Sequence, residues 1–356
     1  MPTTFATAMK NQEKKNLRHL SQEEIKNVLE GVGEKSFRTK QVWEWLWQKG
    51  VGSIEEMSNL SKDLRTKLSE QYDLYSVAID SNQRSSDGTM KIKFRTHDNH
   101  FIEGVLIPAE DRMTACVSSQ IGCSLTCKFC ATGTMGRTRN LDFDEIFDQV
   151  VLLNKLAITE HARPLTNIVY MGMGEPLLNY SQVLKSIDRI TMPDGLGMSP
   201  RRITVSTAGI SKMIKKLADD EVRFRLALSL HAADDQKRRR MMPINDENNI
   251  ESLMEALQYF WDKTGNRISF EYILFEGIND TVQDAKNLAA LARKFKVLLV
   301  NLIEYNRVEG AAFTGLHFSK MEKFKGLLEQ YGINATIRRS RGKDIDAACG
   351  QLAIKE

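Results

Sequence analysis

Three of the five cysteines in the chain lie within eight residues, in the stretch Cys-Ser-Leu-Thr-Cys-Lys-Phe-Cys from position 123 to position 130. At spacings of four and three residues, the thiolates of Cys123, Cys127 and Cys130 can hold one metal centre. A ferredoxin-type cluster takes four cysteines, so a four-iron cluster on three sulfurs keeps one iron without a protein ligand. The spacing therefore predicts a [4Fe-4S] cluster whose open iron binds a small chelating molecule.

Two other interpretations compete with the iron-sulfur cluster. The three cysteines could be buried thiols, or they could bind zinc with His100, His161 or His231 as the fourth ligand. Chance clustering at these spacings is rare, and none of the three histidines stands at a zinc-ligand spacing. The cluster is therefore the favoured interpretation.

The other two cysteines, Cys116 and Cys349, stand apart from this stretch. A lone cysteine is most often a small buried apolar residue. Cys116, however, belongs to a predicted strand that leads to the three-cysteine stretch. Cys349 lies in a polar C-terminal segment beside basic residues, a setting that favours a reactive thiol. Both are therefore candidates for catalysis.

The aromatic Phe129 directly precedes the last cysteine of the stretch. With it, the pattern resembles the signature of radical S-adenosylmethionine (SAM) enzymes. In those enzymes the open iron binds the amino and carboxylate groups of SAM. The resemblance implies that the chain uses a [4Fe-4S] cluster and SAM as cofactors.

Length and composition fit a cytosolic protein of about two domains. The chain has 356 residues, which is enough for one domain with a full core. We see no apolar run near the roughly 18 residues of a membrane span, and residues 1–18 lack the apolar core of a signal peptide. In a reducing compartment, five cysteines indicate metal or catalytic use rather than a disulfide framework.

The net charge is only +4, but the basic residues are clustered. Residues 201–202, 237–240 and 338–343 each form a local basic run. One such run is typical of a solvated face, whereas three in one catalytic domain favour a polyanionic substrate.

The first 74 residues predict a small helical domain. Ser21 and Glu24 have the spacing of a capping box, and Trp43 and Trp47 share one face of a second helix. Because Trp45 lies off that face, it is the tryptophan that could stack on nucleic-acid bases.

The pattern then changes to alternation, and residues 75–108 predict a connector of three strands at 75–79, 90–94 and 101–107. Glu103 lies on the third of these strands. By pattern alone it is a surface carboxylate.

From residue 109 to residue 356, short β-rich runs alternate with helical patterns. The strands are expected at 114–118, 167–171, 202–206, 223–229, 268–274 and 298–303, with helices at 143–156, 250–261 and 282–295. Six such units predict an α/β fold, namely a partial (β/α)6 barrel related to TIM barrels, with a doubly wound sheet as the alternative. Small polar residues follow several strands, as a polar cofactor bound at the carboxyl ends of the strands requires.

Longer motifs extend the resemblance. They are Val-Ser-Ser-Gln at 117–120, Ala-Thr-Gly at 131–133, Met-Gly-Met-Gly-Glu-Pro at 171–176, Met-Pro-Ile-Asn at 242–245 and Asp-Ile-Asp-Ala-Ala-Cys-Gly-Gln-Leu at 344–352. Together they resemble the RNA adenine methyltransferases of the RlmN/Cfr group from about residue 103 to residue 352. The helical domain agrees more weakly, and the resemblance implies that it is an accessory RNA-binding domain.

The resemblance implies a mechanism with two SAM molecules per turnover. The Cys349 thiolate takes a methyl group from the first SAM. The second SAM is reduced and cleaved to a 5′-deoxyadenosyl radical, which abstracts hydrogen from that methyl group, and the methylene radical adds to the base. Glu103 then removes the ring proton, and Cys116 attacks the Cys349 sulfur, so that a disulfide forms and the methylated RNA is freed. The SAM-binding positions that the resemblance implies are Gly174, Glu175, Ser206, Ser229, Leu230, His231 and Asn306.

The implied target is C2 of an adenosine in the peptidyl-transferase centre of 23S rRNA and, in many bacteria, the adenosine beside the tRNA anticodon. Resistance-conferring relatives methylate C8 of the same rRNA adenosine. The sequence Gly174-Glu175-Pro176 and the developed helical domain favour the C2 type.

We also expect that a flavodoxin or ferredoxin donates the electrons and that the protein is a monomer. Two other classes stay open at this stage, namely a zinc-bearing RNA-binding protein and a radical SAM enzyme acting on a small molecule.

Overall fold

The computed structural model describes residues 14–295 and 298–354. These residues form two compact units. The first holds the described residues up to Ser76 together with Asp194–Leu196, and the second holds the rest of the described chain.

The first unit is helical, as predicted. Its elements are β1 (Lys15–Asn16), α1 (Gln22–Gly31), α2 (Phe37–Trp47), α3 (Lys62–Gln71) and β2 (Tyr72–Asp73), with short 3-10 turns at Leu17–His19 and Ile54–Glu56. The predicted capping box is confirmed, because Ser21 Oγ accepts from the Glu24 N–H and the Ser21 N–H donates to the Glu24 carboxylate. Apolar side chains of all three helices form the core.

The tryptophans of α2 divide as the helical period predicts. Trp43 and Trp47 are buried, with ring centroids 5.9 Å apart in an edge-to-face arrangement. Trp45 is only partly buried. Its indole N–H donates to Asn59, and the Lys49 ammonium lies 3.6 Å from the ring centroid. A cation therefore covers one face of the ring, and base stacking by Trp45 stays a prediction.

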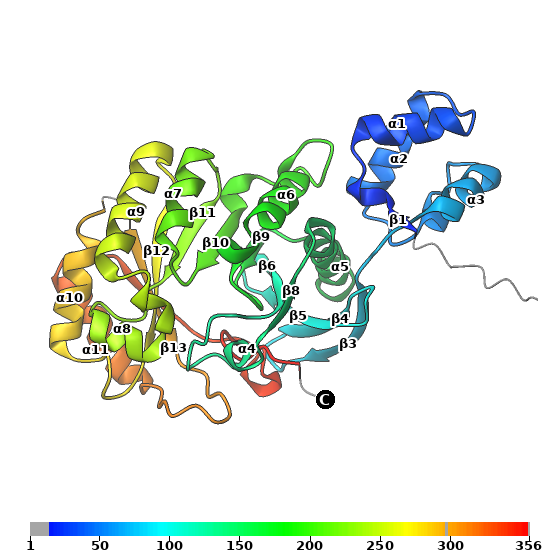
Figure 1. The fold of residues 1–356 in the computed structure, drawn as a ribbon. Coiled ribbons are helices and arrows are strands. Elements are labelled where there is room, and N and C mark those ends of the chain that lie inside the picture. Colours follow the sequence, from blue (N-terminus) through cyan, green and yellow to red (C-terminus); the bar gives the residue numbers. More distant parts are fainter. Residues whose placement is uncertain (1–13, 296–297, 355–356) are drawn as a thin grey trace, which may run out of the picture. The chain divides into compact units, whose positions relative to one another are not determined.

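The second unit contains a ten-stranded sheet in the order β14-β13-β12-β11-β10-β9-β6-β5-β4-β3 (Figure 1). Its strands are β3 (Ala78–Arg84), β4 (Met90–Arg95), β5 (Phe101–Pro108), β6 (Met113–Cys116), β9 (Asn167–Tyr170), β10 (Ile203–Thr207), β11 (Arg225–Ser229), β12 (Ile268–Leu274), β13 (Leu298–Glu304) and β14 (Ala335–Arg338). The six predicted strands from β6 to β13 are parallel and adjacent in chain order. Because this order has no reversal, the partial barrel is confirmed and the doubly wound alternative is wrong.

Helices cover one side of this curved sheet (Figure 1). They are α5 (Phe143–His161), α6 (Tyr180–Thr191), α7 (Ser211–Asp219), α8 (Asp235–Met241), α9 (Ile250–Thr264), α10 (Val282–Ala292) and α11 (Phe318–Gln330). Two shorter features flank the three cysteines, namely helix α4 (Ala131–Thr134) and a hairpin of β7 (Gln120–Gly122) and β8 (Arg137–Asn140). Because this layer of helices covers the parallel strands, the side chains that point toward it are buried, and the strands are rich in apolar residues.

The strands of residues 75–108 join the same sheet as an antiparallel extension. The expected strand at 75–79 is wrong, because β3 runs from Ala78 to Arg84. As the edge strand, β3 is exposed along its whole length, so it carries no apolar alternation by which it could be recognised. A seventh parallel strand, β14, pairs with β13 and was not expected.

The strand register selects the side chains that share one face. Directly paired residues, and residues two apart on a strand, point to the same side of a sheet. Val105 pairs with Cys116, Ser229 pairs with Glu271, and Ile303 pairs with Arg338. Followed across all the strands, this rule places one set on a single face: Glu103, Val105, Cys116, Met171, Ser206, Ser229, Glu271, Ile303 and Arg338.

Candidate active site

A cavity lies at the carboxyl ends of the parallel strands. Its walls include most of the residues expected at a SAM and cluster site: Cys123, Cys127, Cys130, Gly174, Glu175, Ser206, Ser229, His231 and Cys349. Four other expected residues, Leu230, Asn306, Cys116 and Glu103, do not line it. Leu230 is buried behind it, and its N–H donates to the Glu271 carbonyl (3.0 Å). The Asn306 side-chain amide donates to the Cys349 carbonyl (3.4 Å).

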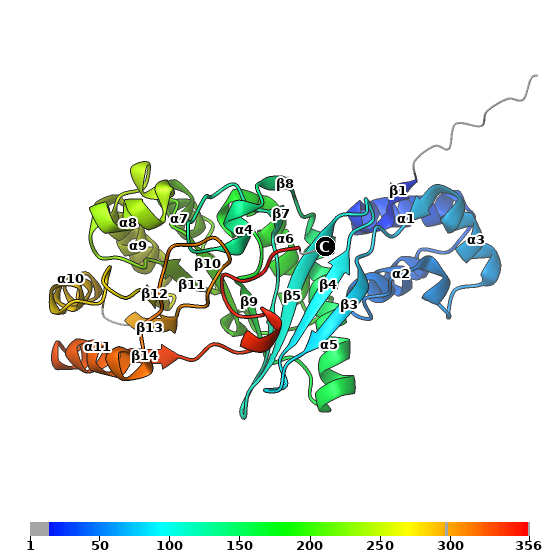
Figure 2. The ribbon, with the colours of Figure 1, turned by 90° about the horizontal axis from the view of Figure 1, so that it is seen from below.

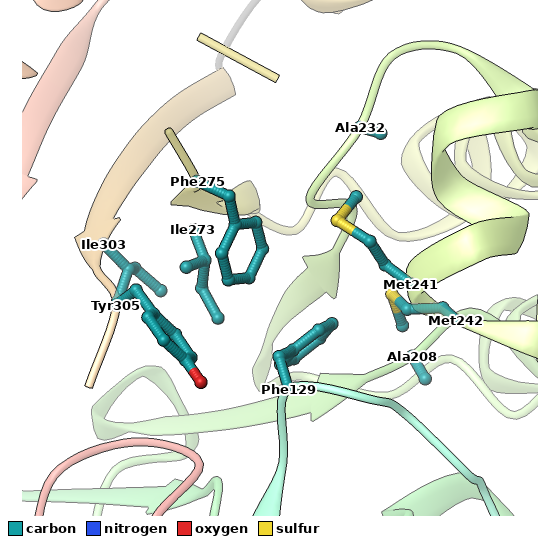
Figure 3. Packing of buried hydrophobic residues seen from close by; sticks show 9 residues of the cluster. All are labelled: Phe129, Ala208, Ala232, Met241, Met242, Ile273, Phe275, Ile303 and Tyr305. Atoms are coloured by element: carbon teal, nitrogen blue, oxygen red, sulfur yellow. The ribbon is translucent and has the colours of Figure 1, made fainter. Parts of the chain in front are cut away.

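Phe129 anchors the three-cysteine loop to the barrel. Its ring is 6% exposed and packs among Phe275, Tyr305, Met242 and other apolar residues (Figure 3). The Lys128 N–H donates to the Met241 carbonyl at 3.0 Å, so the loop backbone is also fixed. An aromatic residue directly before the last cysteine therefore holds the loop on the barrel, where its thiols line the cavity.

His231 is not available as a zinc ligand. Its Nδ1 accepts a hydrogen bond from the Ile273 N–H (3.0 Å), and its ring lies edge-on to Phe129, with centroids 4.9 Å apart. Burial lowers the pKa of His231 to about 3, so the ring is neutral. Since Nδ1 accepts a hydrogen bond, the one ring proton is on Nε2, and neither nitrogen has a lone pair left for a metal. The other proposed fourth ligands, His100 and His161, do not line the cavity.

The three thiols suit a cluster better than a single ion. Tetrahedral zinc at about 2.3 Å from each sulfur places sulfurs about 3.8 Å apart. Within the described residues, no three cysteine sulfurs lie within 4.8 Å of one another. Burial raises the pKa of Cys123 to about 11 and also raises the pKa values of Cys127 and Cys130, so three thiolates here require a strongly positive partner. A multi-iron centre meets both conditions.

Gly174 and Glu175 fix the loop that follows β9. Gly174 has φ +94°, and a Cβ there would lie 2.5 Å from the Gln120 Cβ, so no larger residue fits without strain. The two Glu175 oxygens accept from the Ala208 N–H (2.7 Å) and the Leu177 N–H (3.0 Å). This carboxylate joins the ends of β9 and β10, and burial raises its pKa.

Glu271 is a polar residue of the cavity that the sequence analysis did not single out. Its Oε1 accepts from Asn301 (2.8 Å) and Ser269 (2.9 Å). Its buried Oε2 has no hydrogen-bond partner, although the Arg338 guanidinium forms a long ion pair with it at 3.8 Å. A buried acceptor that lacks a hydrogen bond, in the wall of a cavity, indicates a ligand that brings a hydroxyl or ammonium group. SAM carries both. The sequence did contain a signal for Glu271, because a carboxylate within the largely apolar strand Ile-Ser-Phe-Glu-Tyr-Ile-Leu is unusual.

The C-terminal segment, red in Figure 2, lies beside β5. Its Cys349 lines the cavity. The Gly350 carbonyl accepts from the Ala131 N–H (2.7 Å), and the Leu352 carbonyl accepts from the Thr132 hydroxyl (2.6 Å). Both donors belong to α4, which directly follows Cys130. Four residues beyond Cys349, the Ala353 N–H donates to Glu103 Oε2 at 2.9 Å. The segment is thus tied to the cluster loop on one side and to β5 on the other.

A second cavity adjoins the first. Cys116, Cys349 and Arg338 line it, and Cys349 and Arg338 also line the first cavity. Burial raises the pKa of Cys116 to about 12. The nearby Cys349 sulfur raises the pKa of Arg338, so this guanidinium keeps its positive charge beside the thiols. Cys349 therefore lies between the cluster cysteines and Cys116.

The interpretation of Glu103 as a surface carboxylate is wrong. Its side chain is buried, the Lys91 ammonium lies 3.6 Å from Oε1, and burial raises its pKa. It faces a separate polar pocket with Lys91 and Lys93.

Comparison with known proteins agrees with this geometry. Residues 117–289 match the model of the radical SAM superfamily. A solved structure, "Crystal Structure of a radical SAM methyltransferase from Sphaerobacter thermophilus", superposes with a TM-score of 0.89 and 39% identity, over 95% of this chain and 99% of that chain. The partial barrel and its three-cysteine cavity are those of a radical SAM enzyme.

The remaining comparisons identify the family. Residues 15–74 match the "Ribosomal RNA large subunit methyltransferase N-terminal domain". A "Probable dual-specificity RNA methyltransferase RlmN" of Cytophaga hutchinsonii is 57% identical over 343 residues, which are 96% of this chain and 94% of that protein. The "Dual-specificity RNA methyltransferase RlmN" of Anaeromyxobacter dehalogenans is 43% identical over 344 residues, 96% of this chain and 92% of that protein. The chain belongs to the RlmN family of radical SAM RNA methyltransferases.

The expected class of enzyme and its cofactors are thereby confirmed. The chain is a SAM-dependent RNA methyltransferase with a [4Fe-4S] cluster. Within the described residues, none of the helices combines the length and apolar character needed to cross a bilayer.

The two groups of cysteines should differ in iron binding. Cys127→Ser removes a thiol of the three-cysteine loop, so anaerobically reconstituted protein should hold far fewer than the roughly four irons of a [4Fe-4S] cluster. Cys116→Ser changes a thiol outside that cavity and should keep wild-type iron and the brown absorbance. Iron and sulfide assays measure both. Equal iron loss in the two variants would contradict the assignment.

Proposed function

We propose that this enzyme methylates C2 of an adenosine in the peptidyl-transferase centre of 23S rRNA and the adenosine beside the anticodon in tRNA. The observation that carries the proposal is the place of Cys349, which lines the cavity of the three cluster cysteines and also the cavity of Cys116. A sulfur in that position can receive a group from SAM on one side and be attacked by a second thiol on the other. The names of the relatives support RNA as the shared substrate class.

Cys349 acts as the methyl carrier. Its thiolate attacks the methyl carbon of one SAM, so that a carbon–sulfur bond forms on the protein, the bond from that methyl group to the SAM sulfur breaks, and S-adenosylhomocysteine leaves. An adenine C2 is electron-poor and the SAM methyl is an electrophile, so direct polar transfer between them is mismatched. A cluster held by Cys123, Cys127 and Cys130 would supply, with a second SAM, the radical chemistry. A hydrogen atom taken from the methyl group on Cys349 would leave a carbon radical there, which removes the mismatch.

Glu103 and Cys116 complete the reaction on the protein side. Glu103 takes the ring proton. Its carboxylate faces a pocket separate from the thiol cavities, so the base must lie where that pocket and the Cys116 cavity approach each other, along the C-terminal segment that lines both. The Ala353 N–H of this segment donates to Glu103 (2.9 Å). Cys116 then attacks the Cys349 sulfur. A sulfur–sulfur bond forms, and the bond between the Cys349 sulfur and the RNA-linked carbon breaks with its electron pair on that carbon, which takes up a proton to become the methyl group. The methylated RNA then leaves. A cluster bound at the three cysteines would take back the unpaired electron that the radical addition leaves on the ring.

SAM is held by the loops after the strands. Glu175 and Gly174 shape the loop after β9, and Ser206 and Ser229, whose hydroxyl oxygens lie 3.4 Å apart, offer polar groups from β10 and β11. A flavodoxin or ferredoxin supplies the electrons, and the enzyme works as a monomer in the cytoplasm.

The nucleoside made by the enzyme tests the proposed position. RNA from a strain lacking the gene should lose 2-methyladenosine from both 23S rRNA and tRNA, as measured by mass spectrometry of nuclease digests. Restoring the gene should restore the nucleoside. Loss of 8-methyladenosine alone would instead assign the enzyme to the C8 type.

Variants that lack one or the other of the two proposed catalytic thiols should stop at different steps of the reaction. Cys349→Ala removes the carrier, so methylation of RNA should stop with no covalent intermediate. Cys116→Ala keeps the Cys349 carrier but removes the thiol that breaks the link between Cys349 and the RNA. A covalent protein–RNA adduct should therefore accumulate. Denaturing gels with labelled RNA distinguish the two. Normal turnover by Cys116→Ala would refute the release step, and full activity of Cys349→Ala would refute the carrier.

Glu103 should impose an acid limit on product release. A proton acceptor works as the carboxylate, and burial raises its pKa, so the rate should fall as the pH decreases toward that raised value. Glu103→Gln should slow release by roughly 10² to 10⁴-fold and should abolish this acid limb. Single-turnover rates against pH, with enzyme already methylated on Cys349, measure both effects. An unchanged acid limb in the variant would assign the proton transfer to another group.

A further inference from the structure

The arginines that leave β14 take no part in the mechanism above. Arg338, Arg339 and Arg341 all line the cavity that contains Cys116 and Cys349. Much of the remaining wall is apolar and includes Val105, Ile107, Met171, Ile303 and Leu352. A cavity with an apolar wall, two thiols and a rim of guanidinium groups has the composition of a nucleotide site.

Arg339 presents a stacked guanidinium. Its central carbon lies 4.3 Å from the centroid of the Phe318 ring, and Phe318 is itself 37% exposed at the start of α11. Across residues 14–295 and 298–354, no carboxylate forms an ion pair with Arg339. Its charge is therefore available to an anion, and its flat outer face is available to a base.

Arg341 is also weakly engaged. Its side chain is 47% exposed, and the nearest carboxylate oxygen, from Asp87, is 3.9 Å away. That carboxylate already accepts from the N–H groups of Gly342 (3.0 Å) and Thr89 (2.9 Å). Lys343 differs, because its ammonium lies 2.6 Å from Glu304. Arg338 differs as well, because its guanidinium lies 3.8 Å from the Glu271 carboxylate and beside Cys116 and Cys349. Of the basic run at 338–343, Arg339 and Arg341 are therefore the residues that offer charge at the rim.

We propose that Arg339 and Arg341 bind the RNA phosphates on either side of the target adenosine, whose base enters at the mouth of this cavity. An enzyme that modifies a base carbon must take the base out of its stack, and an unstacked base requires both an apolar surface and a hold on the flanking backbone. Guanidinium groups match phosphate oxygens with two parallel hydrogen bonds. The neighbouring base stacks on the Arg339–Phe318 pair. This inference rests on the proposed role of Cys349, because the base must reach that sulfur.

RNA affinity of charge-neutral variants tests the site. Arg339→Gln and Arg341→Gln should each weaken binding of an rRNA fragment about five- to tenfold near 0.1 M salt, and each should lower the salt dependence by about one phosphate contact. Arg339→Lys keeps the charge but loses the flat stack, so it should retain the salt dependence while its affinity falls. Fluorescence anisotropy over a salt series measures these values on the reconstituted holoenzyme.

The matched control is Arg293→Gln. Arg293 is also exposed and also lies over an aromatic ring, 5.8 Å from the Tyr331 centroid, but it does not line the thiol cavity. The control should bind RNA as the wild type does. Affinities of the Arg339 and Arg341 variants within twofold of the control, with an unchanged salt dependence, would overturn the proposal.

Analysis of the methylated nucleoside distinguishes a failure of the proposed phosphate site from a failure of the proposed function. If the wild type makes 2-methyladenosine while the variants bind RNA normally, the phosphate site is wrong and the proposed function stands. If the variants lose affinity as expected but the wild type makes no 2-methyladenosine, the site stands and the proposed function fails.

Discussion

The structure depends on a small set of hydrogen bonds that hold the C-terminal segment across the sheet. Gly350 and Leu352 accept from α4, directly after the last cluster cysteine, and Ala353 donates to Glu103 on β5. Each bond alone is worth about 1 kcal/mol. Together they hold Cys349 beside the three-cysteine loop, although the two are far apart in the sequence. The proposed chemistry needs this placement, because a methyl carrier must reach both SAM and the RNA base.

The sheet supplies the second constraint. Side chains alternate between faces, so a one-residue change of register on β5 or β6 would turn Glu103 or Cys116 away from the shared face. The observed register keeps both on the face that also carries Ser206, Ser229 and Glu271. The antiparallel extension thus brings a carboxylate to a barrel that by itself provides the Cys116 thiol and the cluster and SAM site.

Much of this fold follows from local sequence. The six parallel strands are short apolar runs between helical patterns, and such runs are visible without the structure. β14 is only four residues long, and β3 is an exposed edge, so neither carries that signal. Glu103 was read as exposed because carboxylates are rarely buried. The residue that contacts it, Ala353, is 250 positions away, and no local pattern contains that contact. The proposed role of Glu103 came from its position before Cys116 in the family resemblance, and Glu271 was missed because no motif included it.

The central claim is that Cys349 lies against the SAM and cluster site. Electron–nuclear double resonance on the reduced cluster tests it most directly, with enzyme that carries a ¹³C-methyl group on Cys349 and bound SAM. The account predicts a resolved hyperfine coupling between that carbon and the cluster, which disappears when the methyl group is unlabelled. A labelled sample that shows no coupling would place the sulfur away from the cluster and would contradict the account.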